Sequence, residues 1–145
     1  MQIVEFHDTH IADILKVEAE CFSSPWSEKM FKEEISGKFS HYYVAEVDGL
    51  AVGYMGMWAL SGEGHITNVA VAREYRRKGI AKALISHFIE IAKREQLEFM
   101  TLEVRESNTP AISLYKSFDF KEAGVRKNYY DNRENALLLT KFFGE

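Results

Sequence analysis

The apolar residues of one long stretch recur at the spacing of an amphipathic helix. From Gly79 to about Gln96 they fall on one side of a helix, at Ile80, Ala83, Leu84, Phe88 and Ile91. The residues before this stretch, from 65 or 66 to Val71, are mostly apolar and predict a short strand. A basic loop joins the two, so the pattern predicts strand, loop and helix in that order.

Shorter patterns elsewhere in the chain predict the remaining elements. Strands are expected at 2–6, 41–47, 51–60, 99–104, 120–130 and 135–141. Helices are expected from residue 8 or 9 to about 22, from 27 to about 35, and from 109 onward. Turns are expected at Asp48-Gly49, from Ser61 to Gly64, and at Asp131-Asn132-Arg133.

The first of these helices is expected to turn one apolar stripe toward the core. That stripe consists of Ile11, Ile14, Leu15, Ala19 and Phe22. Asp8 or Thr9 can cap this helix, and Ser27 can cap the second one. Proline directly after Thr109 is typical of the start of a helix and opens the last one.

These elements predict an α/β fold with a mixed sheet. Strand, helix and strand between residues 66 and 104 imply a right-handed crossover, so strands 66–71 and 99–104 are expected to be parallel. The other strands follow one another through short turns and are expected to pair antiparallel. The prediction is a mostly antiparallel sheet of about seven strands with one central parallel pair and flanking helices. At 145 residues the chain is expected to form a single domain, 1–145.

Composition narrows the classes of function. The net charge of −4 argues against a general nucleic-acid binder, although residues 73–82 carry a basic run. The chain has neither the pattern of a signal peptide nor a stretch of about 20 apolar residues, so no membrane span is expected. Cys21 is the only cysteine, which favours a reducing, cytoplasmic location.

The basic loop and the start of the long helix suit an anion. Free backbone N–H groups and the positive end of the helix dipole meet there, which favours a phosphate. Gly79 lets the backbone approach a ligand closely, because it has no Cβ. The small side chain of Ala81 leaves nearly as much room for a ligand at that position. Arg76, Arg77 and Lys78 add positive charge beside those amides. A solvated basic turn is the alternative explanation of the same residues.

Two further segments reach the same edge of the sheet, because the ends of parallel strands lie side by side. Glu103 interrupts an otherwise apolar strand pattern: it is either a solvated or ion-paired charge at the strand end or a reactive carboxylate. Tyr115 follows helical spacing, so it is either a core aromatic or a reactive hydroxyl. Asn108 is typical of a turn or cap. The five histidines show no metal-ligand spacing.

The chain resembles the GNAT superfamily of N-acetyltransferases. Residues 76–81, Arg-Arg-Lys-Gly-Ile-Ala, resemble its (Gln/Arg)-x-x-Gly-x-(Gly/Ala) pyrophosphate loop, with Ala81 where many members have glycine. Residues 102–120 and 126–130 are similar to the RimI-type branch of that superfamily, and so are residues 20–22 and 25–28. The similarity therefore extends over nearly the whole chain.

The resemblance implies a function and the residues that carry it. Acetyl-CoA would be the co-substrate, without a metal, with Glu103 as general base and Tyr115 as general acid. The acceptor would be a protein N-terminal α-amine, in this branch the N-terminal alanine of a small-subunit ribosomal protein, with no direct nucleic-acid or membrane contact. The implied coenzyme contacts are Val69, Ala70, Val71, Arg76, Arg77, Lys78, Gly79, Ile80, Ala81, Lys82 and Asn108.

Other functions are compatible with the same residues. One is a family member that acts on a lysine side chain, a polyamine or another small amine; a second is a non-catalytic acyl-CoA-binding module. A third, a small nucleic-acid-binding domain, conflicts with the overall acidity. Proton loss at pH 7 costs about 1.4 kcal/mol for an α-amine and about 4.6 kcal/mol for a lysine, which favours the α-amine. A monomer or weak dimer is expected.

Overall fold

The computed structural model describes residues 1–130 and 133–143. Within these residues the strands form one seven-stranded sheet. The strands are β1 (Gln2–Glu5), β2 (Ser40–Val47), β3 (Leu50–Leu60), β4 (Glu63–Val71), β5 (Phe99–Arg105), β6 (Lys121–Tyr130) and β7 (Glu134–Phe142). The α-helices are α1 (Ile11–Cys21), α2 (Glu28–Ile35), α3 (Ile80–Arg94) and α4 (Thr109–Lys116), and short 3-10 helices span Asp8–His10 and Arg73–Tyr75.

The topology confirms the predicted fold class. The strand order is β1-β2-β3-β4-β5-β7-β6, and β4 and β5 form the parallel pair among otherwise antiparallel neighbours of the described sheet. The predicted hairpin turn is confirmed at Asp48 and Gly49, which both have positive φ, 51° and 81°. Of the turn predicted near the C-terminus, Asp131 and Asn132 lie outside the described residues.

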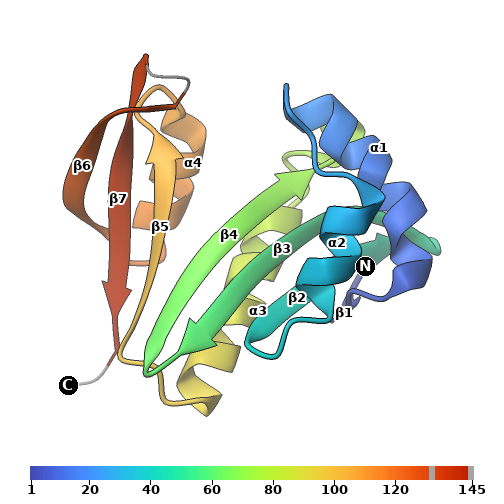
Figure 1. The fold of residues 1–145 in the computed structure, drawn as a ribbon, viewed down its shortest axis with the longest axis horizontal. Helices are drawn as coiled ribbons and strands as arrows, with labels where there is room; N and C mark the ends of the chain where they lie inside the picture. The colour runs from blue at the N-terminus through green and yellow to red at the C-terminus, as the bar shows by residue number, and fades with distance from the viewer. Residues whose placement is uncertain (131–132, 144–145) are drawn as a thin grey trace.

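The sheet has a front face, which carries α1 and α2, and a back face, which carries α3 and α4 (Figure 1). The larger apolar core lies at the back and includes Met55, Leu84 and Phe88. A second core lies at the front and includes Ile14 and Phe31. The front helices cover the half of the sheet formed by β1–β4. Within the described chain, the front of β5, β7 and β6 carries no helix (Figure 1).

The parallel pair is shorter than the sequence predicts. β4 and β5 pair from Glu63–Phe99 to His65–Thr101, so the stretch 66–71 runs beyond the paired part. The ladder between β3 and β4 skips Thr67 opposite the step from Gly56 to Met57. Such a bulge bends a strand and increases its twist. The carboxyl ends of β4 and β5 therefore diverge, and the sheet is split in its middle (Figure 1).

The turn before β4 is also shorter than predicted. It consists of Ser61 and Gly62, with φ of 54° and 82°, whereas Glu63 and Gly64 already belong to the strand. Gly64 is needed for packing rather than for the turn, since a Cβ there would lie 2.9 Å from the Leu97 side chain. β4 consequently begins two or three residues earlier than its apolar pattern indicates.

The buried stripe of α1 differs from the predicted one at its C-terminal end. Ala19 and Phe22 are exposed, and Glu18 is buried in their place with 1% of its surface exposed. The Tyr54 hydroxyl donates a hydrogen bond to the Glu18 carboxylate, and the Trp26 backbone N–H donates a second one at 2.9 Å. Burial raises the pKa of Tyr54 far above its usual value, so this hydroxyl stays protonated. Glu18 thus anchors the segment between α1 and α2 to the sheet.

Replacing Tyr54 with phenylalanine is expected to lower the free energy of unfolding by about 1–3 kcal/mol, because the buried Glu18 carboxylate loses a donor. Urea denaturation at pH 7 measures the change. Tyr43→Phe is the matched control, since the Tyr43 hydroxyl has no hydrogen-bond partner among the described residues and its loss should cost little. Equal losses in the two variants would contradict a stabilising role for the Glu18–Tyr54 contact.

Candidate active site

A cleft of about 820 Å³ lies between the diverging part of β4, the start of α3 and the start of α4. Three segments far apart in the sequence line it, as the topology predicts. From the predicted set, the lining residues are Val69, Ala70, Val71, Arg76, Arg77, Gly79, Ile80, Ala81, Lys82, Asn108 and Tyr115. The residues predicted for a coenzyme site are therefore brought together around one cavity, with the exception of Lys78.

Lys78 belongs to the basic run but does not line the cleft. Its ammonium group lies over the ring of Tyr75, 5.3 Å from the ring centre. This is cation–π geometry, which holds the charge on an aromatic side chain of the loop. Tyr75 itself lines the cleft. Lys78 therefore adds positive charge near the cleft without being part of its lining.

The start of α3 presents unsatisfied backbone donors to the cleft. Gly79 is the N-cap residue in the left-handed conformation, with φ of 82°, and no side chain caps the helix there. The first N–H groups of a helix have no acceptor inside the helix, and the helix dipole adds partial positive charge to them. Arg77 also has positive φ, 63°, and alternation of this kind turns successive N–H groups toward one concave spot. The geometry suits a phosphate group.

Tyr115 is both a core residue and a cleft residue. Only 2% of its surface is exposed, and its ring packs edge-on against Phe120 with 5.3 Å between ring centres. It also lines the cleft. Burial raises the pKa of the Tyr115 hydroxyl well above its ordinary value, so the group carries its proton at neutral pH. The two explanations of Tyr115 considered from the sequence are therefore compatible.

Glu103 lies outside the cleft lining, on the front face of β5. Along β5, Met100, Leu102 and Val104 are buried at the back, whereas Glu103 alternates with them and is partly exposed. Its Oε2 atom lies 2.5 Å from Nε of Arg126 on β6. Of the explanations considered from the sequence, the geometry shows an ion-paired charge, and the reactive carboxylate stays a prediction. A strand with one open face also explains why a charge interrupts its apolar pattern.

The comparison with known proteins decides the family. The profile described as acetyltransferase (GNAT) family matches residues 11–120. The chain belongs to the GNAT family. It is therefore an acetyl-CoA-dependent N-acetyltransferase, as the sequence resemblance implies.

Relatives of this GNAT chain are similar over most of their length. A Bacillus subtilis protein proposed to be a ribosomal protein bS18 alanine N-acetyltransferase is 40% identical over 131 residues, 89% of this chain and 87% of its own. The Escherichia coli ribosomal protein bS18 alanine N-acetyltransferase is 31% identical over 140 residues, 94% of each chain. The crystal structure of the Escherichia coli ribosomal-protein-S18-alanine N-acetyltransferase superposes with a TM-score of 0.89 and 31% identity, covering 99% of this chain and 96% of that one.

The GNAT cleft also contains residues outside the predicted coenzyme contacts. Cys21 and Phe22, from the end of α1, line it. The Cys21 thiol lies 3.2 Å from Nη2 of Arg76 and 3.6 Å from the Val71 carbonyl oxygen, to which Nε of Arg76 also donates a hydrogen bond at 3.0 Å. Fifty positions separate Cys21 from Val71, and no local pattern indicates their contact.

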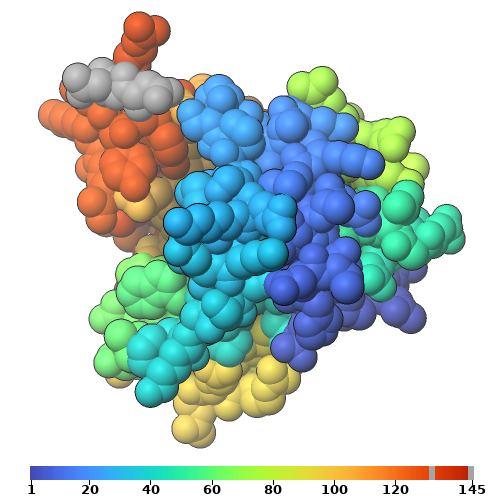
Figure 2. Space-filling view, turned by 45° about the vertical axis from the view of Figure 1, so that its right-hand side comes forward, coloured from blue at the N-terminus to red at the C-terminus, as the bar shows by residue number. Residues whose placement is uncertain are grey.

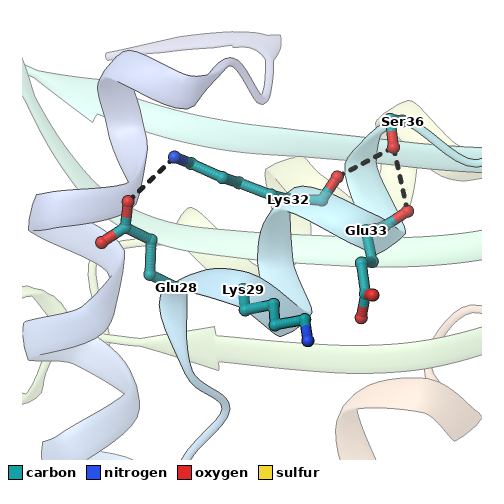
Figure 3. A pocket seen from close by; sticks show the side chains of 5 residues that line it. All are labelled: Glu28, Lys29, Lys32, Glu33 and Ser36. Carbon is teal, nitrogen blue, oxygen red and sulfur yellow. Dashed lines mark hydrogen bonds and ion pairs between the residues drawn. The ribbon is translucent and has the colours of Figure 1, made fainter.

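A second, open depression lies on α2 (Figure 3) and shares no lining residue with the cleft. Its five lining residues come from one short helix: Glu28, Lys29, Lys32, Glu33 and Ser36. Glu28 and Lys32 form an ion pair of 3.0 Å across one turn, and the Ser36 hydroxyl donates to backbone carbonyls of the same helix. These are ordinary contacts of a solvated helix and bring no convergent chemistry together.

The described part of the chain lacks two further kinds of feature. No group of three or more His, Cys, Asp or Glu side chains is arranged to hold a metal ion. None of its helices is both long enough and apolar enough to cross a membrane.

Proposed function

We propose that this GNAT enzyme transfers acetyl from acetyl-CoA to a protein N-terminal α-amine, and that its acceptor is the N-terminal alanine of ribosomal protein bS18. The observation that carries the proposal is the split between β4 and β5. β4 lines the cleft at this split, and Glu103 lies on the front face of β5, the strand on the other side of the split. The names of the similar Bacillus subtilis and Escherichia coli proteins support the choice of acceptor.

In this proposal the coenzyme enters from the carboxyl ends of β4 and β5. Its diphosphate binds the N–H groups at the start of α3, with Arg76, Arg77 and Lys82 nearby. The pantetheine arm follows β4 along Val69, Ala70 and Val71, near Asn108, and the thioester comes to lie in the split. A backbone N–H of β4 can then polarise the thioester carbonyl.

The reaction needs no covalent enzyme intermediate. The neutral amine attacks the thioester carbon, the nitrogen loses a proton to Glu103, directly or through water, and the carbon–sulfur bond breaks. Tyr115 gives its proton to the departing thiolate, which suits a hydroxyl that burial keeps protonated. Positioning the two substrates across the split supplies much of the rate. Glu103 and Tyr115 are thus proposed as general base and general acid.

Replacing Tyr115 with phenylalanine is expected to lower kcat by about 10- to 100-fold while the dissociation constant of acetyl-CoA changes less than about threefold, since only a proton donor is lost. Steady-state kinetics and calorimetric titration measure the two quantities. Tyr75→Phe is the control, because Tyr75 lines the same cleft and no proton transfer is proposed for its hydroxyl. A Tyr115→Phe enzyme with full turnover would rule out the general-acid role.

The acceptor is tested by mass spectrometry after incubation with acetyl-CoA. A peptide with the N-terminal sequence of bS18 should gain one acetyl group on its α-amine. Matched peptides with a blocked N-terminus and one lysine, and a polyamine, should react at least 100-fold more slowly, as the cost of removing the amine proton predicts. Faster reaction of a lysine or polyamine would favour the alternative acceptors, and binding without turnover would favour a non-catalytic module. A cytoplasmic location, a single domain and a monomer or weak dimer stay predictions.

A further inference from the structure

A second charged pair lies beside the one that holds Glu103, on the front of the helix-free half of the sheet. Arg105 Nη1 lies 3.3 Å from Oε1 of Glu134, and its guanidinium lies over the ring of Tyr130, 4.3 Å from the ring centre. Glu134 in turn accepts a hydrogen bond from the Ser107 N–H at 2.8 Å. Glu134 is thus an ion-pair partner of Arg105, and Arg126 is an ion-pair partner of Glu103.

The fold leaves room for Arg126 to reach Glu103 across an intervening strand. Glu103 on β5 is opposite Leu138 on β7, and Leu138 is opposite Gly124 on β6. Two strand spacings of about 4.8 Å each separate β5 from β6. Gly124 offers no side chain to fill that space, and Ala136, opposite Arg126, has a short one. An arginine side chain is long enough to cross this gap.

Oε2 of Glu103, the atom beside Arg126, is buried and makes no hydrogen bond among the described residues, but the two side chains as a whole are open enough to take part in acceptor binding. The side chain of Arg126 is 58% exposed and that of Glu103 is 29% exposed. The guanidinium also lies 5.7 Å from the centre of the Tyr129 ring. Among the described groups, Tyr130 on β6 is within electrostatic reach of Glu103, and Arg105 on β5 and Glu134 on β7 act on the same tyrosine. Burial and, after it, the charge of Glu103 raise the pKa of Tyr130, which therefore stays neutral.

We propose that Arg126 is a positioning residue that makes the site accept the acceptor amine in its neutral, reactive form. This inference rests on the proposed function, in which Glu103 meets that amine. A carboxylate without a counter-ion would attract the ammonium form and hold it as an unreactive ion pair. The guanidinium already neutralises Glu103, so a second cation gains little there. Glu103 then receives the proton after attack, when the nitrogen is far more acidic.

The test is the pH dependence of turnover for Arg126→Gln with the bS18 peptide. The pH dependence of kcat reports groups in the complex, whereas that of kcat/KM reports the free enzyme and free peptide. Removing the guanidinium favours the bound ammonium, so the acidic limb of kcat should move to higher pH by about one unit. At pH 7 kcat should fall about tenfold, and near pH 9.5 it should match the wild type within about twofold. The acidic limb of kcat/KM, set by the free peptide, should not move.

Two variants make the result specific. Arg126→Lys keeps a positive charge and should restore most of the wild-type kcat profile. Lys121→Gln removes a positive charge from the same strand, five residues or about 16 Å away, and should shift nothing. A loss that is equal at all pH values, a change confined to KM, or an unchanged profile for Arg126→Gln would overturn the proposal.

Failure of the proposed function would look different. In that case the wild-type enzyme would leave the bS18 peptide unmodified and acetylate another amine. The same shift of the kcat profile is then expected with that amine, because the argument depends on Glu103 and Arg126 and not on the rest of the acceptor. Absence of turnover on every amine would overturn both proposals.

Discussion

Replacing Glu103 with glutamine is expected to lower kcat by about 100- to 1000-fold at pH 7, the usual contribution of a general base. Glutamine has the same shape but accepts no proton, so the fold should not change. Glu103 does not line the cleft, and the dissociation constant of acetyl-CoA should stay within about twofold of the wild-type value. Stopped assays with the bS18 peptide give kcat, and calorimetric titration gives the affinity for the coenzyme.

Glu122→Gln is the matched control for that experiment. Glu122 is also an ion-paired carboxylate, with its Oε2 2.6 Å from Nζ of Lys116 on α4, and it does not line the cleft. Its loss should leave kcat within about twofold. Comparable rates for Glu103→Gln and Glu122→Gln would show that Glu103 is a structural charge and that another group takes the proton.

The second large effect is expected at the start of α3. Gly79→Val should weaken acetyl-CoA binding by about 100-fold, equivalent to about 3 kcal/mol or the loss of two charge-assisted hydrogen bonds. A Cβ at Gly79 would meet no protein atom within 4 Å, so its side chain would point into space that the diphosphate is proposed to fill. Stability should fall by only about 1–2 kcal/mol, the strain of a side chain at a φ of 82°.

Gly49→Val is the control that separates the loss of coenzyme affinity from the loss of stability. Gly49 has nearly the same φ, 81°, and equally open surroundings, but it lies in the hairpin turn between β2 and β3. Both variants should lose similar stability in urea denaturation, and only Gly79→Val should lose affinity for the coenzyme. If the Gly79→Val enzyme binds acetyl-CoA as tightly as the Gly49→Val enzyme does, Gly79 is needed only for its backbone conformation and not for coenzyme binding.

Local patterns explain the parts of the fold that the sequence predicts well. The long helix shows its 3.6-residue period within its own residues, and Asp48-Gly49 has the positive φ values that its residue types favour. The parallel pair follows from the handedness of the connection between β4 and β5. The converging segments at the cleft follow in turn from that pair, which is why Gly79, Asn108 and Tyr115 meet there as predicted.

Contacts between distant residues explain the parts that could not be predicted. Burial of Glu18 depends on hydrogen bonds from Tyr54 and Trp26, and a helical stripe read from apolar residues alone selects Ala19 instead. The bulge at Thr67 that opens the sheet leaves no mark in the alternation of β4. Arg126 and Glu103 come from β6 and β5, with β7 between them, so no local pattern shows that they meet. Figure 2 shows the orange-red C-terminal strands beside the blue helices of the N-terminal part, which are far from them in sequence.

The most direct measurement is a crystal structure of the protein soaked with coenzyme A. The account predicts the diphosphate against the N–H groups at the start of α3, beside Gly79, and the thiol in the split between β4 and β5. A cleft that stays empty, a cleft filled by side chains, or a coenzyme bound elsewhere on the molecule would contradict it.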